Sequence, residues 1–324
     1  MTLFKRRYYL PATPREVHDF FLDVRNMERV WPPELGMKVV ERMDSVFRVR
    51  FRLLGQIWTA SFRIIEEPEY RQRHETLDFP FGVLRHSIEI APSEGGSIVS
   101  EYVELRSRIP FASRFLARVW DYREAMIKRS FGLDVQAIYR DPTRIGLLAG
   151  TAISMGAVAA AVALTLAPTQ YDSLIGFLTR LASWLLLWFF THDLAHLAVG
   201  ALVGVKFSHY YLGLSNVVRL GILPRALRLA PLALGIRIDR ERTRASPRGY
   251  AAMYAAGPLA SMFTPLLVPA AMLLDQPTST AGLLFLAASL ANIAFTSYFS
   301  PKAGCFAKAS KALRRARSGS RGAP

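Results

Sequence analysis

Two histidines in this sequence have a spacing that suits a metal ion. His192 and His196 stand four residues apart in an apolar segment. On a helix such residues project about 40° apart around the axis, so both imidazoles can face one point. Zinc needs this convergence because its ligands lie about 2 Å away in roughly tetrahedral directions. Asp193 is a candidate general base for a metal-activated water, and we expect a zinc site with His192 and His196 as ligands.

A polar patch that hydrogen-bonds neighbouring helices is the alternative interpretation. Ionisable groups inside a bilayer are costly, so three of them within five residues require either a function or partners. The spacing favours metal binding but leaves the patch open.

The histidines lie in the second of four apolar segments, each close to the length of about 20 residues that crosses a bilayer. Only five of the 25 acidic residues follow residue 144, against 17 of the 41 basic ones. The sequence therefore predicts an all-α membrane domain with four transmembrane helices, at 145–167, 181–205, 250–274 and 281–299.

The links between these segments alternate in charge. The 206–249 link holds nine basic residues against two acidic ones, and the segment from Lys302 onward holds seven basic and no acidic residues. The 168–180 link holds one of each, and Asp275 is the only charge between the last two segments. Basic links stay in the cytoplasm, so we expect an integral protein of the cell membrane with both termini cytoplasmic.

The positive charge is expected to contact anionic headgroups of the lipid bilayer, because it directly flanks the apolar segments. Nucleic acid is excluded as a partner, since no helix-turn-helix or zinc-finger spacing occurs. The single cysteine, Cys305, excludes an internal disulfide framework.

A third protein ligand for the metal is not evident. No acidic residue follows Asp275, and Asp172 and Asp275 are expected on the far side of the membrane. Asn292 offers only an amide oxygen, a poor ligand for zinc. His209, thirteen residues after His196, is therefore the best candidate.

Residues 1–142 have the mixed pattern of a soluble domain. A strand at 4–10 precedes a helix that Thr13 can cap and Pro14 can begin. Alternating segments at 38–42, 46–54, 56–65, 83–90 and 97–107 predict strands. Residues 111–139 predict one long amphipathic helix. This order is typical of an α+β helix-grip fold.

Residues 9–20 (YLPATPREVHDF) resemble the opening of the START-like superfamily of polyketide cyclases and lipid-transfer proteins. The resemblance covers about residues 3–140 and implies an apolar cavity for a hydrophobic small-molecule ligand. His18, His74 and His86 are candidate polar groups of that cavity, although we expect ordinary surface or turn positions for them. Because members include enzymes and pure binders, the resemblance implies no catalytic residue.

The membrane segments resemble the site-2 protease family of intramembrane zinc metalloproteases over about residues 145–305. His192-Asp193-Leu194-Ala195-His196 stands where that family has H-E-x-x-H, which implies zinc and makes Asp193 the general base. Residues 254–261 (YAAGPLAS) match a second motif, A-G-P-x-x-N. Gly257 and Pro258 would open a helix near the active site, and Ser261 replaces the usual Asn.

The third motif of that family, N-x-x-P…D-G, is incomplete here. Asn292 is present, but Ala303-Gly304 stands about where Asp-Gly is expected. The shorter base and the missing carboxylate favour loss of proteolysis, whereas the retained histidine pair favours activity.

Two functions follow from these observations. The first is a divergent intramembrane zinc metalloprotease that cleaves a transmembrane protein substrate, with a START-like domain that senses lipid or selects substrates. The second is a catalytically inactive, membrane-anchored binder of a hydrophobic ligand. The expected domains are a cytoplasmic START-like domain (1–142), the transmembrane domain (143–301) and a basic cytoplasmic tail (302–324).

Overall fold

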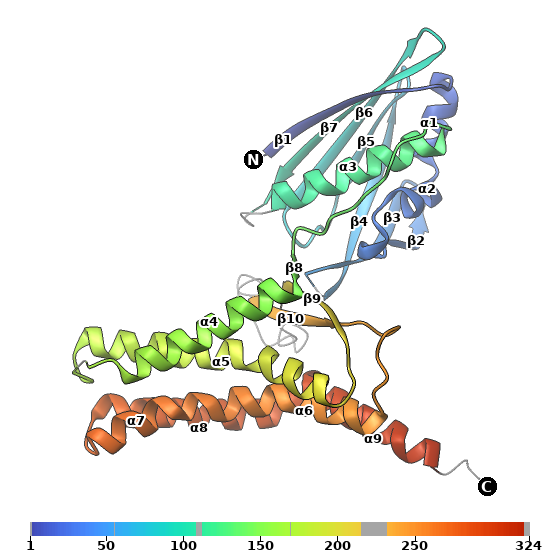
Figure 1. Ribbon diagram of the computed structural model, residues 1–324. Helices are drawn as coiled ribbons and strands as arrows, with labels where there is room; N and C mark the ends of the chain where they lie inside the picture. Colours follow the sequence, from blue (N-terminus) through green and yellow to red (C-terminus); the bar gives the residue numbers. More distant parts are fainter. Residues whose placement is uncertain (1, 55, 108–111, 169, 215–231, 321–324) are drawn as a thin grey trace. The chain divides into compact units, whose positions relative to one another are not determined.

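The computed structural model describes residues 2–320 except 55, 108–111, 169 and 215–231. The chain divides into two compact units, Met1–Pro142 and Thr143–Pro324, shown in Figure 1.

The first unit is built on a seven-stranded antiparallel sheet with the order β1-β7-β6-β5-β4-β3-β2. Apart from the pair β1–β7, neighbouring strands follow one another in the chain, so short turns connect them. The strands are β1 (Thr2–Leu10), β2 (Lys38–Met43), β3 (Val46–Leu53), β4 (Gln56–Glu67), β5 (Arg71–Thr76), β6 (Val83–Ser93) and β7 (Gly96–Arg106).

Two short helices connect β1 to β2. The first, α1 (Pro14–Leu22), begins with the predicted cap: the Thr13 side chain accepts from the backbone of Glu16, and the Glu16 carboxylate accepts from the backbone of Thr13. This reciprocal pair satisfies backbone N–H groups that a helix start leaves free. Helix α2 (Val24–Val30) and the 3₁₀ turn η1 (Pro33–Leu35) follow it.

The long helix α3 (Ala112–Ser130) lies along one face of the sheet (Figure 1). Its buried residues include Leu116, Val119 and Ile127, and the strands supply alternate side chains to this core, as in β7, where every second residue is buried. A sheet that curves around its last helix is the helix-grip arrangement, so the predicted α+β fold is confirmed.

Helix α3 is shorter than the sequence indicated. It ends at Ser130 because Gly132 adopts φ +83°, a left-handed conformation that suits glycine. The N–H of Leu133 then donates to the carbonyl of Lys128, and the N–H of Gly132 to that of Arg129. These bonds form a Schellman cap, so the expected extension to Tyr139 is wrong.

A buried carboxylate joins α3 to the sheet. Glu101 on β7 is fully buried and accepts hydrogen bonds from Tyr8 Oη (2.5 Å) and His86 Nε2 (2.6 Å). It also pairs with the guanidinium of Arg123 on α3. Burial by itself would raise the pKa of Glu101, but the Arg123 charge and the donated hydrogen bonds outweigh it and hold this pKa well below its usual range. The carboxylate is therefore ionised inside the core.

The second unit contains four helical segments that are long and apolar enough to cross a membrane. They are α4 (Leu147–Leu166), α5 (Leu174–Leu202), the continuous run of α6 (Pro247–Phe263), η4 (Thr264–Leu266) and α7 (Leu267–Asp275), and α8 (Thr280–Ala303). Each overlaps a predicted span, which confirms the prediction of four long apolar helices.

Two parts of this unit were not predicted. A three-stranded sheet with the order β10-β9-β8 is formed by β8 (Arg144–Gly146), β9 (Phe207–Leu214) and β10 (Leu232–Ile238). The basic tail is largely one helix, α9 (Cys305–Ser320), which packs against α6.

Side-chain hydrogen bonds connect the apolar helices. Ser183 on α5 bonds to Thr165 on α4 over 2.6 Å, and Trp184 on α5 donates to Ser289 on α8 over 2.9 Å. Polar side chains between membrane helices pair in this way because lipid offers them no partner.

The first prediction concerns the buried carboxylate. Residues 1–142 should fold alone, and Glu101→Gln in this domain should lower its free energy of unfolding by about 3–5 kcal/mol, because Arg123 stays buried without a counter-charge. Burial also lowers the pKa of His74 and His86. The wild-type domain should therefore lose stability as pH falls below 6.5, where unfolded histidines take up protons, and lose more below 4.5, where unfolded Glu101 does.

The second, more acidic loss should be smaller in the Glu101→Gln variant. Denaturant unfolding between about pH 3 and pH 8 measures both effects. Glu89→Gln, at an exposed position of β6, is the matched control. Equal stabilities for wild type and Glu101→Gln, or an isolated domain without cooperative unfolding, would contradict this account.

Candidate functional site

The predicted histidine pair converges inside the membrane domain. His192 and His196 lie on α5 with their Nε2 atoms 3.1 Å apart, and His196 is buried with 5% of its surface exposed. His196 precedes the end of α5 at Leu202 by six residues, or about 9 Å along the helix axis. The pair therefore lies near the end of the helix that leads into β9.

The other nitrogen of each imidazole has its own partner. His196 Nδ1 lies 2.6 Å from the carbonyl oxygen of Met253, which only accepts, so Nδ1 carries the proton. His192 Nδ1 lies 3.2 Å from Ser261 Oγ, and the Ser261 hydroxyl donates to the carbonyl of Pro258 over 3.1 Å. Ser261 therefore accepts from His192. Both Nε2 atoms then keep a free lone pair, as metal-ligating histidines do.

This arrangement fits a cation between the rings. Two lone pairs 3.1 Å apart repel each other unless a positive charge lies between them. Tetrahedral zinc with bonds of about 2.0–2.1 Å to nitrogen places two imidazole nitrogens about 3.3 Å apart. The observed separation is close to that value.

Gly257 on α6 allows the second motif to reach the site. A Cβ atom at this position would lie 2.3 Å from His196 Nε2, well inside contact distance. Helix α6 therefore packs directly on the imidazole ring, and Pro258 follows inside the same helix. Helix α6 thus places Gly257 and Ser261 against the two histidines.

A third side chain that can bind a metal ion, Cys305, lies beside the two histidines. Its Sγ atom lies 3.5 Å from His196 Nε2 and 3.7 Å from His192 Nε2. Among the described residues, these three side chains form the group whose metal-binding atoms all lie within 4.8 Å of one another. Cys305 was not predicted as a ligand, because it is far from the histidines in the chain and no second cysteine marks a metal motif.

The other predicted site residues lie in different surroundings. His209 is on β9, where its Nδ1 atom is 2.9 Å from Ser208 Oγ, and it is not a member of the three-residue group. Asn292 on α8 donates from Nδ2 to the carbonyl of Ser261 over 2.9 Å. It thereby supports the helix that carries Ser261.

Asp193 is buried directly beside the first histidine, with 4% of its surface exposed. It is not in the three-residue group, and Lys308 on α9 acts on it electrostatically.

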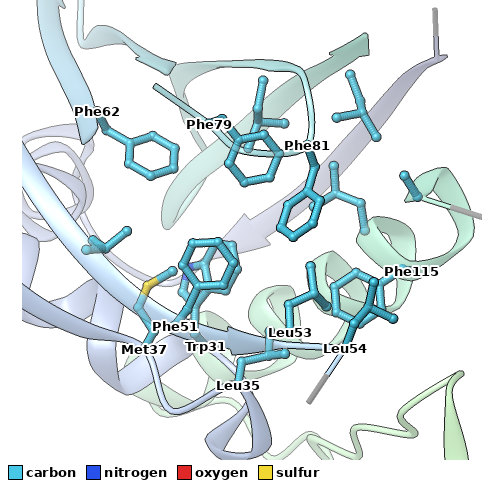
Figure 2. A pocket seen from close by; sticks show the side chains of 15 residues that line it. Trp31, Leu35, Met37, Phe51, Leu53, Leu54, Phe62, Phe79, Phe81 and Phe115 are labelled. Atoms are coloured by element: carbon cyan, nitrogen blue, oxygen red, sulfur yellow. The ribbon is translucent and has the colours of Figure 1, made fainter. Parts of the chain in front are cut away.

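The first unit contains an apolar cavity between its sheet and α3 (Figure 2). Figure 2 shows aromatic rings from several elements around it, and all its lining residues are apolar: Trp31, Leu35, Met37, Val49, Phe51, Leu53, Leu54, Phe62, Phe79, Phe81, Leu84, Leu105, Ala112, Phe115 and Leu116. Such a surface favours a hydrophobic ligand.

The expectation that three histidines of this unit lie at the surface or in turns is wrong. His18, His74 and His86 are 6%, 4% and 5% exposed. His74 and His86 lie on facing strands of the sheet with ring centroids 5.3 Å apart. Both side chains point toward α3. The sequence did not indicate this, because the neighbouring residues in the chain are polar.

Several solved structures are similar to the first unit. No protein-family profile matches the sequence, and no curated protein matches it. A protein of Chromobacterium violaceum is similar with 24% identity and a TM-score of 0.35, over 41% of this chain and 100% of its own. A START superfamily protein from Mycobacterium smegmatis has 11% identity and a TM-score of 0.35, over 40% of this chain and 96% of its own.

The Zhui aromatase/cyclase from Streptomyces sp. R1128 has 13% identity and a TM-score of 0.32, over 40% of this chain and 90% of its own. These likenesses concern the N-terminal part of the chain. The helix-grip assignment of that unit follows from its own strand order and from the course of α3.

The second prediction tests the close packing of α6 on His196. Gly257→Ala should displace the imidazole, because the new methyl group would overlap Nε2. The free energy of unfolding should fall by about 1–3 kcal/mol, as overpacking usually causes, and zinc bound by the purified protein should decrease. Thermal unfolding and elemental analysis in detergent measure the two effects.

Gly156→Ala on α4 is the matched control, since nothing lies within 4 Å of its Cβ position. If Gly257→Ala binds as much zinc as the wild type, the His196 ring and α6 are not in direct contact.

Proposed function

We propose that the membrane domain is a divergent intramembrane zinc metalloprotease of the site-2 protease type. The convergence of ligand atoms from His192, His196 and Cys305 within 4.8 Å is the observation that carries this proposal. The proposed substrate is a transmembrane protein segment, since the site lies within helices long and apolar enough to cross a membrane.

The residues around the site have separate roles in the proposed peptide hydrolysis. A bound zinc ion would supply a Lewis acid that polarises the peptide carbonyl and makes water more acidic. Asp193 accepts the proton that the attacking water loses and passes it to the leaving amine. Met253 and Ser261 hold both imidazoles with Nε2 toward the ion, and Gly257 leaves room for the His196 ring.

The soluble domain is proposed to bind a hydrophobic small molecule, lipid or substrate side chain. Its cavity is apolar throughout. In the helix-grip fold, the last helix covers a cavity of this kind. Occupancy of this cavity would then determine which membrane proteins reach the protease. In the second candidate function, this binding is the whole activity and the membrane domain is an anchor.

The proposed orientation places both termini in the cytoplasm of a cell-membrane protein. The support is the alternation of basic and neutral links around the four spans. Lys206, Arg244 and the basic residues of α9 then lie on the cytoplasmic side, where they face anionic headgroups.

The third prediction separates metal binding from hydrolysis. Wild-type protein purified gently in detergent should carry one zinc ion per chain, and His192→Ala or His196→Ala should abolish it. Asp193→Asn should keep the ion but lower any cleavage by about 10²–10⁴-fold, because it removes the proton acceptor and leaves the ligands. Elemental analysis and cleavage of tagged single-span proteins in vesicles give the two readouts.

Protein that carries no zinc, and gains none when zinc is added, would refute the protease proposal. The membrane-anchored binder would then be the remaining function. Asp275→Asn, at the end of α7, is the control for charge loss in this domain.

The fourth prediction tests the orientation. A single cysteine at position 275 in a Cys305→Ser background should react with a membrane-impermeant maleimide in intact cells, because the 275–280 link is expected outside. A cysteine at position 206 should react only after the membrane is opened. Reaction of position 275 from the cytoplasmic side alone would overturn the proposed topology.

A further inference from the structure

Cys305 lies at the corner where α8 ends and α9 begins. Two hydrogen bonds to Ser300 hold this corner: the N–H of Gly304 donates to the Ser300 carbonyl over 2.9 Å, and the N–H of Phe306 donates to Ser300 Oγ over 3.1 Å. The backbone is thus held on both sides of Cys305. Helix α9 also packs on α6 and buries Ala309, so the cysteine belongs to a docked element.

The distances around Cys305 match those of a metal centre. For bonds of about 2.0–2.1 Å to nitrogen and about 2.3 Å to sulfur, tetrahedral zinc places sulfur and nitrogen about 3.5–3.6 Å apart. The Sγ atom lies 3.5 Å from His196 Nε2 and 3.7 Å from His192 Nε2. The two sulfur–nitrogen distances and the nitrogen–nitrogen distance are therefore close to those expected around one ion.

Hydrogen bonding alone explains the cluster less well. A thiol has one proton and is a weak donor, so it can satisfy only one of the two imidazole lone pairs. The second lone pair would find a partner only if His192 carried its proton on Nε2 and donated to His196, and Ser261 would then have to donate to His192 instead of to Pro258. One cation satisfies both nitrogens and the sulfur together.

We propose that Cys305 supplies, as a thiolate, the third protein ligand of a metal centre with His192 and His196. The inference rests on the metal-dependent function proposed above and names its ligand set. Binding releases the thiol proton to solvent. A thiolate with two imidazoles selects zinc, cobalt(II) or cadmium over magnesium and calcium. Three protein ligands leave one tetrahedral position open, as in catalytic zinc sites.

The fifth prediction uses cobalt(II) as a spectroscopic probe. Full-length protein in detergent is stripped of metal with a chelator and titrated with Co²⁺. The wild type should show the visible bands of tetrahedral cobalt and a near-ultraviolet band from thiolate-to-cobalt charge transfer. Cys305→Ser should lose the charge-transfer band, and its affinity for Zn²⁺ should fall by more than the roughly 10–100-fold that loss of a supporting residue costs.

Two further variants make the result specific. Cys305→His should regain tight Zn²⁺ binding without the charge-transfer band, because it restores a ligand but no sulfur. Ser310→Ala, at an exposed position of α9, should behave as wild type. Bound Zn²⁺ should also protect Cys305 from alkylation in the wild type.

The possible failures can be told apart. If the wild type binds Co²⁺ without a charge-transfer band, and Cys305→Ser binds Zn²⁺ equally tightly, the assignment of Cys305 is wrong while the metal-dependent function stands. If the wild type binds neither ion, both proposals fail.

Discussion

The direct contact between the His196 ring and Gly257 is the constraint on which the membrane site depends. Without a side chain at this position, α6 comes close enough to α5 for Met253 to accept from His196 and for Ser261 to accept from His192. The same helix forms the surface on which α9 docks. One missing side chain thus positions both imidazoles and, through α9, the sulfur atom opposite them.

The two units differ in how far the hydrogen-bonding capacity of their buried polar groups is satisfied. Glu101 is saturated, since a tyrosine, a histidine and an arginine all contribute hydrogens to its carboxylate. Such a group stabilises the position of α3 and has no remaining capacity for a ligand. In the membrane domain, the outer nitrogen of each histidine is satisfied while the inner lone pairs converge on one point. Saturation indicates a structural role for the first cluster, and convergence supports the metal binding proposed for the second.

Much of this architecture was predictable because it depends on local patterns. Thr13 and Glu16 form the expected cap, the membrane helices match apolar runs, and the strands that alternate in polarity were recognised. Strand β5 was missed because Arg71–Thr76 is polar, and only its neighbours in the sheet make it a strand. Gly132 ended α3 earlier than the apolar periodicity suggested. His86 appeared to be a surface residue since its partner, Glu101, is fifteen residues away. The proximity of Cys305 to the histidines could not be predicted for the same reason, because helix packing and not the local sequence brings these residues together.

The order of the proposed ligands along the chain has a consequence for biosynthesis. Cys305 follows His196 by 109 residues, and the third and fourth apolar helices lie between them. At about 5–20 residues per second, roughly 5–20 s of translation separates the histidines from the cysteine. During that interval the nascent protein has two ligands and no third, so any metal it holds is weakly bound. In the proposed site the ion would be captured firmly only after the fourth apolar helix has been made, which would make metal loading a late event in the maturation of this protein.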